Sequence, residues 1–404
     1  MGATLRPNSF SPQPETVTSA NLRQYLTIIA ALSAAFFVAI LGPVFCLVEW
    51  SGWRLGATKP LSVIAREQQA GKLLWLGAFK DYAPYKLERI KLVQPEVLLV
   101  GSSRCGQARE QVFRPYKTYN ACLTAWPLDH AVDFIDRATR EAKPRVVVLA
   151  LDYFLFGDGL ADAWRKERTM DYRQGLDSHR RKIHDIVEFA ARNNWNLRAF
   201  LKPLEEDQFE PIDNNRLVGT EAIRGQFGFR NDGSIFVAPP YRNTSAYQLA
   251  RGVEYVTGSF PGGQHLSEIQ FKELQRLSQL AVDRDFTVVA IQYPLLKSAT
   301  DFMDTNQAYW PSAGLWRELR SETTAKRFAN LGIKFFDMSR DPLAADPGNF
   351  FDPAHPSERG ILRTIISLLD RNDFKDLFPL IDKGALESDL RKTLSTSDVF
   401  DLYH

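Results

Sequence analysis

The chain has 404 residues, of which 45% are hydrophobic and 24% are charged. This balance is typical of a folded protein and excludes a wholly disordered one, and the length allows one large domain or two smaller ones. The formal net charge of +2 is close to neutral, and no Lys/Arg block is interleaved with aromatic residues. Nucleic acid is therefore not expected as a partner.

The amino-terminal region combines a polar tail with a long apolar segment. Residues 1–22 are rich in Ser, Thr, Pro and Asn and are expected to form a disordered tail. Segment 25–48 has no charged residue and, at about 1.5 Å per helical residue, is long enough to span a hydrocarbon core of about 30 Å. Apolar regions of cleaved signal peptides are usually shorter, and Trp50 and Trp53 suit an interfacial aromatic belt. We predict a retained transmembrane anchor over residues 23–49.

The short tail before this anchor favours an amino terminus on the cytoplasmic side. The remainder of the chain is then expected outside the cytoplasm, in the periplasm or at the cell surface. The protein would be a single-pass protein of an inner or plasma membrane.

Strand-like and helical segments alternate along residues 95–374. Continuous apolar runs at 97–100 and 146–151 are typical of strands buried on both faces. The other strands are expected at 118–120, 287–292 and 333–337, and the helices at 128–142, 266–283, 315–330 and 356–369. This alternation predicts an α/β fold with a parallel sheet and helices on both faces.

Two segments flank this unit and one interrupts it. Residues 50–94 are expected to form a stalk and a leading helix, with helical periodicity over 61–76, and residues 375–404 a helical tail. An α+β insertion is expected after the third strand, at about 155–249, with charged helical sequence over 164–191. Within it, an Asp-Gly pair between two apolar runs predicts a hairpin around 228–237. The insertion serves either as a substrate lid or as a plain cover for the sheet.

The chain has three cysteines, Cys46, Cys105 and Cys122, and no C-x-x-C pair, so a zinc site or redox motif is not expected. Cys105 and Cys122 each follow an expected strand, and a disulfide would form if those strands were neighbours. Two unpaired thiols are favoured, because free cysteine is commonly buried.

A serine pair follows the first strand, in the sequence Gly101-Ser102-Ser103. Open α/β sheets bind ligands outside the carboxyl ends of their strands. A serine there lies near a helix amino terminus, whose N–H groups can stabilise an oxyanion. The alternative is that one of the serines simply caps the next helix.

Asp352 and His355 precede the last helix, at the same edge of the predicted sheet. Their spacing lets the carboxylate orient the imidazole, and a serine hydroxyl needs such a base to become a nucleophile. The alternative makes Asp352 a turn residue and His355 a helix-start residue. Because all three groups belong to one edge of the sheet, we predict a Ser-His-Asp triad.

These motifs resemble those of the SGNH (GDSL-like) hydrolase superfamily, whose members carry a serine after the first strand and Asp-x-x-His near the carboxyl terminus. More narrowly, the chain resembles the membrane-anchored branch with Gly-Ser-Ser-Arg in place of Gly-Asp-Ser. That branch is similar to exopolysaccharide O-acetyltransferases and to the teichoic acid D-alanine transfer protein. The resemblance implies a flavodoxin-like sheet in which Ser103 is the nucleophile, His355 the general base and then acid, and Asp352 the group that orients His355.

The resemblance also implies a serine esterase or O-acyltransferase that acts on ester-linked acyl groups of a cell-envelope or exported polysaccharide. The expected partners are an acylated carbohydrate or acyl donor, the membrane, and a membrane-bound acyltransferase. No cofactor and no metal are implied.

The oxyanion hole implied by the resemblance uses the Ser103 N–H and two further donors. The family has a glycine after the second strand, where this chain has Asn120-Ala121-Cys122, and an asparagine at the position of Asp152. An ionised carboxylate cannot donate a hydrogen bond. Asp152 would serve only when protonated, or would hold Arg104 instead. Asn120 and the Cys122 N–H are the substitute donors.

Three further residues are candidates for substrate binding: Arg104, Trp126 and Tyr153. The two aromatic residues follow strand ends, where they either wall a sugar-binding cleft or pack in the core. A competing hypothesis is a catalytically inert accessory protein that keeps the fold and binds a glycan or an envelope-assembly partner. The carboxylate of Asp152 and the missing glycine favour that hypothesis.

Overall fold

The computed structural model describes residues 19–36, 38–39, 42, 46, 60–69, 73–74, 82–124, 127–157, 217–218, 227–237, 263–305, 313–392 and 399–400. Its centre is a five-stranded sheet in the order β3-β2-β4-β8-β9, in which every neighbouring pair is parallel. The strands are β2 (Val97–Gly101), β3 (Thr118–Cys122), β4 (Val146–Ala150), β8 (Thr287–Gln292) and β9 (Lys334–Asp337). The predicted α/β fold with a parallel sheet is confirmed. The chain leaves β2 toward β3 and then returns to β4 on the other side, and ligands of open α/β sheets bind at such a reversal.

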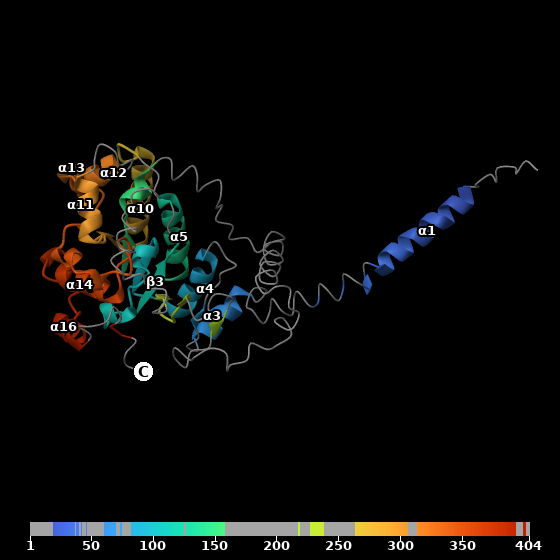
Figure 1. The fold of residues 1–404 in the computed structure, drawn as a ribbon, viewed down its shortest axis with the longest axis horizontal. Coiled ribbons are helices and arrows are strands. Elements are labelled where there is room, and N and C mark those ends of the chain that lie inside the picture. Colours follow the sequence, from blue (N-terminus) through green and yellow to red (C-terminus); the bar gives the residue numbers. More distant parts are fainter. Residues whose placement is uncertain are drawn as a thin grey trace, which may run out of the picture.

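The two faces of the sheet bury alternate residues of each strand, as the period of two requires. On β2, Leu98 and Val100 belong to one apolar cluster, and Val97 and Leu99 to another. The first face is covered by helices α4 (Ala83–Val93), α5 (Leu128–Glu141) and α10 (Glu268–Arg284), and the second by α14 (Glu358–Leu368) and α16 (Lys383–Lys392) (Figure 1). Helices therefore lie on both faces, as expected.

The remaining elements connect or extend this body. They are α1 (Ser19–Phe36), α3 (Leu61–Gln69), β1 (Leu73–Leu74), β5 (Leu217–Val218), β6 (Phe227–Phe229), β7 (Ile235–Val237), α11 (Lys297–Thr305), α12 (Ala313–Leu319), α13 (Glu322–Asn330) and α15 (Asn372–Lys375), with short 3-10 helices η2 (Ser103–Cys105), η3 (Glu110–Phe113), η4 (Tyr153–Phe156), η8 (Pro342–Ala345) and η9 (Pro347–Asn349). The single helix expected over 315–330 is wrong. Ser321 caps a new helix by accepting a hydrogen bond from the N–H of Thr324, which divides the segment into α12 and α13.

Helices α3 and α4, in the segment before the sheet, pack in the folded body, whereas residues 50–59 of the expected stalk lie outside the described residues. Helix α4 contributes Ala83, Leu87 and Ile90 to the first apolar cluster. Helix α3 ends at Gln69, whereas helical periodicity predicted a helix to residue 76. The chain continues into β1, which belongs to a second, four-stranded sheet in the order β5-β1-β6-β7. Periodicity alone does not show what a helix packs against.

The predicted hairpin is confirmed: β6 and β7 pair antiparallel. In its turn Gly233 has a φ of 82°, and a Cβ there would lie 2.2 Å from the Asn120 carbonyl oxygen. The buried Lys86 Nζ donates to the carbonyls of Asn120 (2.8 Å) and Gly233 (2.6 Å), and burial lowers its pKa well below the usual value. Ile235 N donates to the Gly106 carbonyl at 2.7 Å, so the hairpin is fastened to the turn that follows β2.

Most of the expected insertion, including the helix expected at 164–191, lies outside the described residues. Its role as a lid or as a cover therefore stays a prediction.

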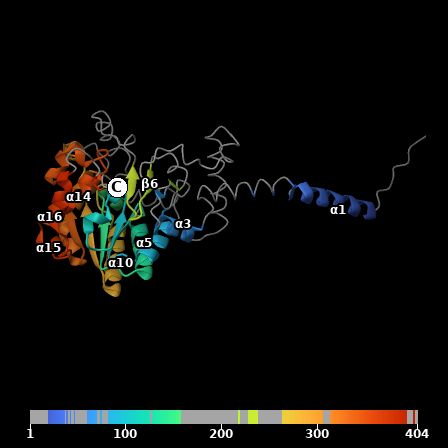
Figure 2. The ribbon, with the colours of Figure 1, turned by 90° about the horizontal axis from the view of Figure 1, so that it is seen from below.

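Helix α1 lies apart from the α/β body in Figures 1 and 2. Its apolar side chains, among them Leu26, Ile29 and Leu32, are exposed. Within the described residues, no helix has both the length and the apolarity needed to cross a membrane. The carboxyl-terminal part of the expected anchor lies mostly outside the described residues.

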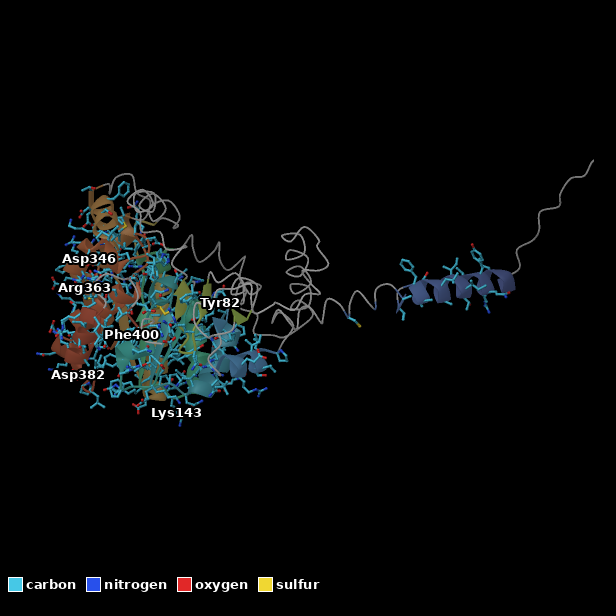
Figure 3. The ribbon with its side chains drawn as sticks, turned by 60° about the horizontal axis from the view of Figure 1, so that its bottom comes forward. Tyr82, Lys143, Asp346, Arg363, Asp382 and Phe400 are labelled. Atoms are coloured by element: carbon cyan, nitrogen blue, oxygen red, sulfur yellow. A yellow bond between two sulfur atoms is a disulfide. The ribbon has the colours of Figure 1, made fainter. Side chains whose placement is uncertain are left out.

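Described residues near the carboxyl terminus contribute to the core. The side chains of Leu386 of α16, Val399 and Phe400 are buried in the cluster on the α14 side of the sheet; Phe400 is labelled in Figure 3. Buried Glu358, the first residue of α14, accepts hydrogen bonds from the N–H groups of Val399 (3.1 Å) and Phe400 (3.2 Å). The other carboxylate oxygen of Glu358, Oε1, accepts a hydrogen bond from Arg109 Nη1 at 2.9 Å.

Candidate active site

The structure brings the three predicted triad residues together. Strand β2 ends at Gly101, where a Cβ would lie 2.5 Å from the Ala150 Cβ of the neighbouring strand, so glycine is needed for this close approach. Ser103 then begins η2, and its Oγ lies 2.7 Å from His355 Nε2. His355 Nδ1 lies 2.8 Å from Asp352 Oδ2 and 3.0 Å from Oδ1. The order nucleophile, imidazole, carboxylate matches the geometry of a Ser-His-Asp triad.

The turn that carries His355 is organised by the same carboxylate. Asp352 Oδ1 accepts hydrogen bonds from the N–H groups of Ala354 (2.8 Å) and His355 (2.9 Å), as Asp side chains do in tight turns. Asp352 is thus both a turn residue and the partner of the imidazole. His355 is not a helix-start residue, because Ser357 caps α14 and the helix begins at Glu358.

The charges favour a basic imidazole next to an ionised carboxylate. Burial lowers the pKa of His355, but the charge and hydrogen bond of Asp352 outweigh it, and the net pKa is raised. Burial raises the pKa of Asp352, but the imidazole and the N–H groups of the turn outweigh it, and the net pKa is lowered. The side chains of His355 and Asp352 are 30% and 37% exposed, so this pair with shifted pKa values is still accessible to solvent.

Ser102 is excluded as the nucleophile. It is fully buried, and its Oγ donates to Asp152 Oδ2 at 2.5 Å and accepts from the Arg104 N–H at 3.2 Å. The capping alternative is therefore correct for Ser102. Asp152 is wrong as an oxyanion donor, because its carboxylate holds Ser102 and forms an ion pair with Arg104. Arg104 is wrong as a substrate-binding residue, because it is 3% exposed and its guanidinium is engaged inside the protein.

Asn120 is wrong as an oxyanion donor. Its Nδ2 donates to the carbonyls of Cys105 (2.9 Å), Gly106 (3.2 Å) and Ala108 (2.8 Å). Its Oδ1 accepts from the Cys122 N–H at 2.9 Å, which also removes Cys122 as a donor. The amide therefore holds the turn after β2 in place. The Ser103 N–H remains a candidate donor, because the first residue of a helix needs no intrahelical partner for its N–H.

Sequence reasoning missed Leu123, which follows β3. Its φ is 70°, the left-handed region that a glycine enters without strain, and strain of this kind in a residue with a side chain is of the order of 1–3 kcal/mol. Its N–H donates to the Ser102 carbonyl at 3.4 Å. The chain thus adopts at Leu123 a backbone conformation for which the sequence offers no glycine.

The aromatic candidates do not form a cleft among the described residues. Tyr153 is 1% exposed, and its ring packs edge-on against Phe154 and Trp316, with centroids 5.4 and 5.5 Å apart. It belongs to the core and is wrong as a substrate-binding residue. Trp126 lies outside the described residues.

Cys105 and Cys122 form a disulfide, so the favoured unpaired state is wrong. Strands β2 and β3 are neighbours, with Gly101 opposite Cys122, and the two cysteine Cα atoms lie 5.8 Å apart, within the usual range for a disulfide. The bond joins the turn that carries Ser103 to the end of β3. The order of the strands, which the sequence left open, decides the pairing.

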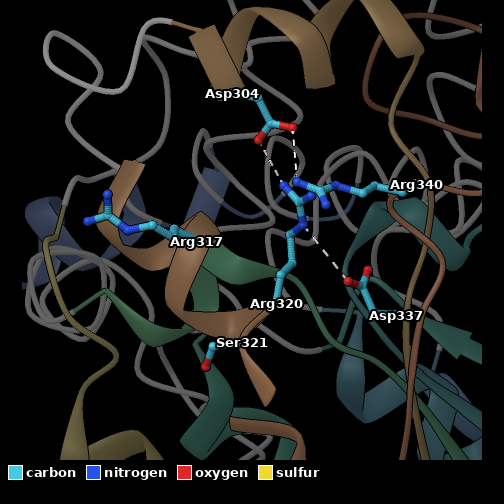
Figure 4. Close-up of a pocket in the computed structure, with 6 residues that line it drawn as sticks. All are labelled: Asp304, Arg317, Arg320, Ser321, Asp337 and Arg340. Atoms are coloured by element: carbon cyan, nitrogen blue, oxygen red, sulfur yellow. Dashed lines mark hydrogen bonds and ion pairs between the residues drawn. The ribbon is translucent and has the colours of Figure 1, made fainter. Parts of the chain in front are cut away.

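A separate pocket of about 330 Å³ lies at the end of β9, lined by Asp304, Arg317, Arg320, Ser321, Asp337 and Arg340 (Figure 4). Asp304 lies 2.9 Å from Arg320 and 3.5 Å from Arg340, and Asp337, whose pKa burial raises, lies 3.9 Å from Arg320. Two aspartates and three arginines thus line this pocket, which contains no member of the triad. Among the described residues, no group of three or more His, Cys, Asp and Glu side chains is arranged to hold a metal ion.

Comparison with protein-family models, with curated proteins and with solved structures returns no match for this chain.

Proposed function

We propose that the protein is a serine-dependent esterase or O-acyltransferase. The observation that carries the proposal is the chain of contacts from Ser103 Oγ through His355 to Asp352. Ser103 Oγ attacks the carbonyl carbon of an ester while His355 Nε2 takes the hydroxyl proton. The ester C–O bond then breaks, and the leaving alkoxide oxygen receives that proton.

The second half of the reaction decides between hydrolysis and transfer. A water or a sugar hydroxyl loses a proton to His355 and attacks the acyl carbon of the Ser103 ester. The bond to Ser103 Oγ breaks, and the serine recovers its proton from the imidazole. The Ser103 N–H, at the start of η2, is the proposed donor to the oxyanion.

The proposed substrates are acyl esters of a cell-envelope or exported polysaccharide, with a membrane-bound acyltransferase as partner. The strand order of the sheet is the one found in flavodoxin-like folds, which supports an SGNH-like architecture. A disulfide beside the nucleophile supports an oxidising compartment outside the cytoplasm. The uncharged segment 25–48 supports attachment to a membrane through the amino terminus.

The experiment is labelling of the full chain with a fluorophosphonate probe, which reacts with activated serines, measured by intact mass and by mapping of the labelled peptide. We expect one adduct on Ser103, lost in Ser103→Ala and in His355→Ala. Ser102→Ala is the matched control and should still label. A folded wild-type protein that takes up no probe would contradict the proposal.

The second candidate is an inert accessory protein. It is favoured by one observation: Asn120, Asp152 and the Cys122 N–H, the candidate oxyanion donors other than Ser103, are all engaged in internal hydrogen bonds. That function predicts no probe adduct and no ester turnover, together with glycan binding that Ser103→Ala leaves unchanged.

A further inference from the structure

The Arg104 side chain lies at the junction of the loops that form the site. Its Nε donates to the Ala354 carbonyl at 2.9 Å. Its Nη2 donates to the carbonyls of Tyr293 (2.6 Å) and Pro294 (2.8 Å), which follow β8. Its Nη1 pairs with Asp152, which follows β4. Through Arg104, which itself follows β2, the ends of β2, β4 and β8 are therefore joined to the loop that carries His355.

The contact with Ala354 links the two halves of the triad. Arg104 directly follows Ser103, and Ala354 directly precedes His355. The Ala354 N–H donates to Asp352 Oδ1 at 2.8 Å while its carbonyl accepts from Arg104. A displacement of this peptide would move both the imidazole and the carboxylate relative to Ser103.

The guanidinium is held in one orientation by its own partners. Asp152 is fully buried and also accepts from Ser102 Oγ at 2.5 Å. Arg104 is 3% exposed, so its charge depends on the carboxylate for compensation. A planar guanidinium presents its donors in fixed directions, whereas a lysine ammonium is a single point of charge on a flexible stem.

We propose that Arg104 is a positioning residue for the triad, which clamps the Ser103 turn to the 352–355 loop through the Ala354 carbonyl. This inference rests on the proposed function. Arg104 touches no reacting atom and acts through the placement of Ser103 and His355.

The charged groups that act on His355 come from three elements: Asp352 on its own loop, Arg104 after β2 and Asp152 after β4. Arg104 lowers the pKa of His355 and Asp152 raises it. The two variants Arg104→Lys and Asp152→Asn therefore separate geometry from charge. Arg104→Lys keeps the positive charge but loses the planar set of N–H donors. Asp152→Asn keeps an acceptor for Arg104 but loses the negative charge.

The experiment measures kcat, KM and the pH profile for a small chromogenic acyl ester, together with the rate of fluorophosphonate labelling and the thermal midpoint. For Arg104→Lys we expect a kcat about 10- to 100-fold lower than that of the wild type and a KM within about twofold of it. The acid limb of the pH profile, where activity falls as His355 is protonated, should have the same midpoint as in the wild type. For Asp152→Asn we expect a smaller loss of kcat and an acid limb at lower pH, because a group that raises the pKa of His355 is gone. Arg140→Lys, an exposed arginine on α5, is the matched control and should change none of these.

A folded Arg104→Lys variant with wild-type kcat and labelling rate would overturn the inference. If that variant does not fold, the double variant Arg104→Gln/Asp152→Asn, which removes the buried ion pair, is compared with Asp152→Asn alone. A kcat clearly below that of Asp152→Asn supports the inference, and a kcat equal to it overturns the inference. If the wild-type protein itself takes up no probe and turns over no ester, the proposed function fails, and the inference fails with it. If the wild type is labelled and Arg104→Lys keeps the wild-type kcat and labelling rate, the inference is overturned but the proposed function stands.

Discussion

Ser102 and Ser103 are neighbours in the sequence, and the hydroxyl of each is connected to an aspartate. Ser102 is fully buried and bonds directly to Asp152 at 2.5 Å. Ser103 reaches Asp352 only through His355, with contacts of 2.7 and 2.8 Å. The first cluster is closed by the ion pair with Arg104, and the second is open to solvent on its His and Asp side chains.

The difference shows what turns a serine-carboxylate pair into a candidate for catalysis. The carboxylate of Asp152 is already engaged by Arg104, and the buried hydroxyl of Ser102 cannot meet a substrate. The imidazole of His355, whose pKa is raised by the charge and hydrogen bond of Asp352, lies between the two groups and can move a proton in both directions. One cluster therefore positions the turn, and the other presents the nucleophile.

The largest expected difference between the two clusters is the loss of activity when the hydroxyl of Ser103, rather than that of Ser102, is removed. Ser103→Ala should lower kcat for a chromogenic ester by about 10⁴-fold or more, because no other nucleophile replaces it. Ser102→Ala should retain kcat within about tenfold and lower the free energy of unfolding by roughly 1–3 kcal/mol, because Asp152 loses a hydrogen-bond donor. Steady-state kinetics and denaturant unfolding measure the two effects, and equal losses of activity in both variants would contradict the assignment.

The next effect concerns the base. Asp352→Asn keeps an acceptor for the turn N–H groups but removes the charge that raises the pKa of His355. Activity needs neutral His355 and is lost as pH falls through its pKa, so the acid limb of kcat/KM should move to lower pH in this variant. The plateau rate should fall by about 10³- to 10⁴-fold.

The matched control for that prediction is Asp346→Asn. Asp346 is a turn carboxylate that caps η9 and pairs with Arg363 at 2.8 Å (Figure 3). The Asp346→Asn variant should have the wild-type pH profile. An acid limb that stays in place in Asp352→Asn would show that Asp352 does not set the pKa of His355.

A smaller effect is expected from the disulfide that fastens the Ser103 turn. The cysteines are separated by 17 positions, and a disulfide that closes a loop of about this length contributes roughly 3 kcal/mol to stability. Cys105→Ser/Cys122→Ser should lose about that free energy of unfolding and label more slowly at Ser103. Cys46→Ser, which removes the free cysteine, should change neither; unaltered stability in the double variant would refute the role given to this bond.

The smallest effect is expected in the hairpin that supports the turn. Gly233→Ala places a Cβ 2.2 Å from the Asn120 carbonyl oxygen at a φ of 82°, and should lower the free energy of unfolding by about 1–3 kcal/mol. Gly332 also has a positive φ, 68°, but has no atom within 4 Å of an added Cβ. Gly332→Ala should therefore cost only about 1 kcal/mol. Similar thermal midpoints for the two variants would argue against the close packing at Gly233.

Much of the fold could be predicted from the sequence, because apolar runs such as the one that forms β8 are local signals. The encounter of Ser103 with Asp352 and His355 could be predicted too, since parallel strands place their carboxyl ends at one edge. The partners of Asn120 could not, because they depend on the path of the 3-10 turn that brings the Cys105, Gly106 and Ala108 carbonyls around one amide. The disulfide could not, because local sequence patterns do not show that β3 lies next to β2 in the sheet.

The fastening of the β6–β7 hairpin has a consequence for anyone who redesigns this chain. A shortened version that removed the expected insertion, about residues 155–249, would delete two buried hydrogen-bond partners. They are the Gly233 carbonyl, which accepts from Lys86, and the Asp232 carboxylate, which accepts from Arg109. Both basic side chains would remain in the interior with fewer acceptors for their N–H groups, a change that is destabilising. A workable minimal domain would therefore have to retain residues 227–237 as a hairpin, because this part of the insertion is bonded into the body.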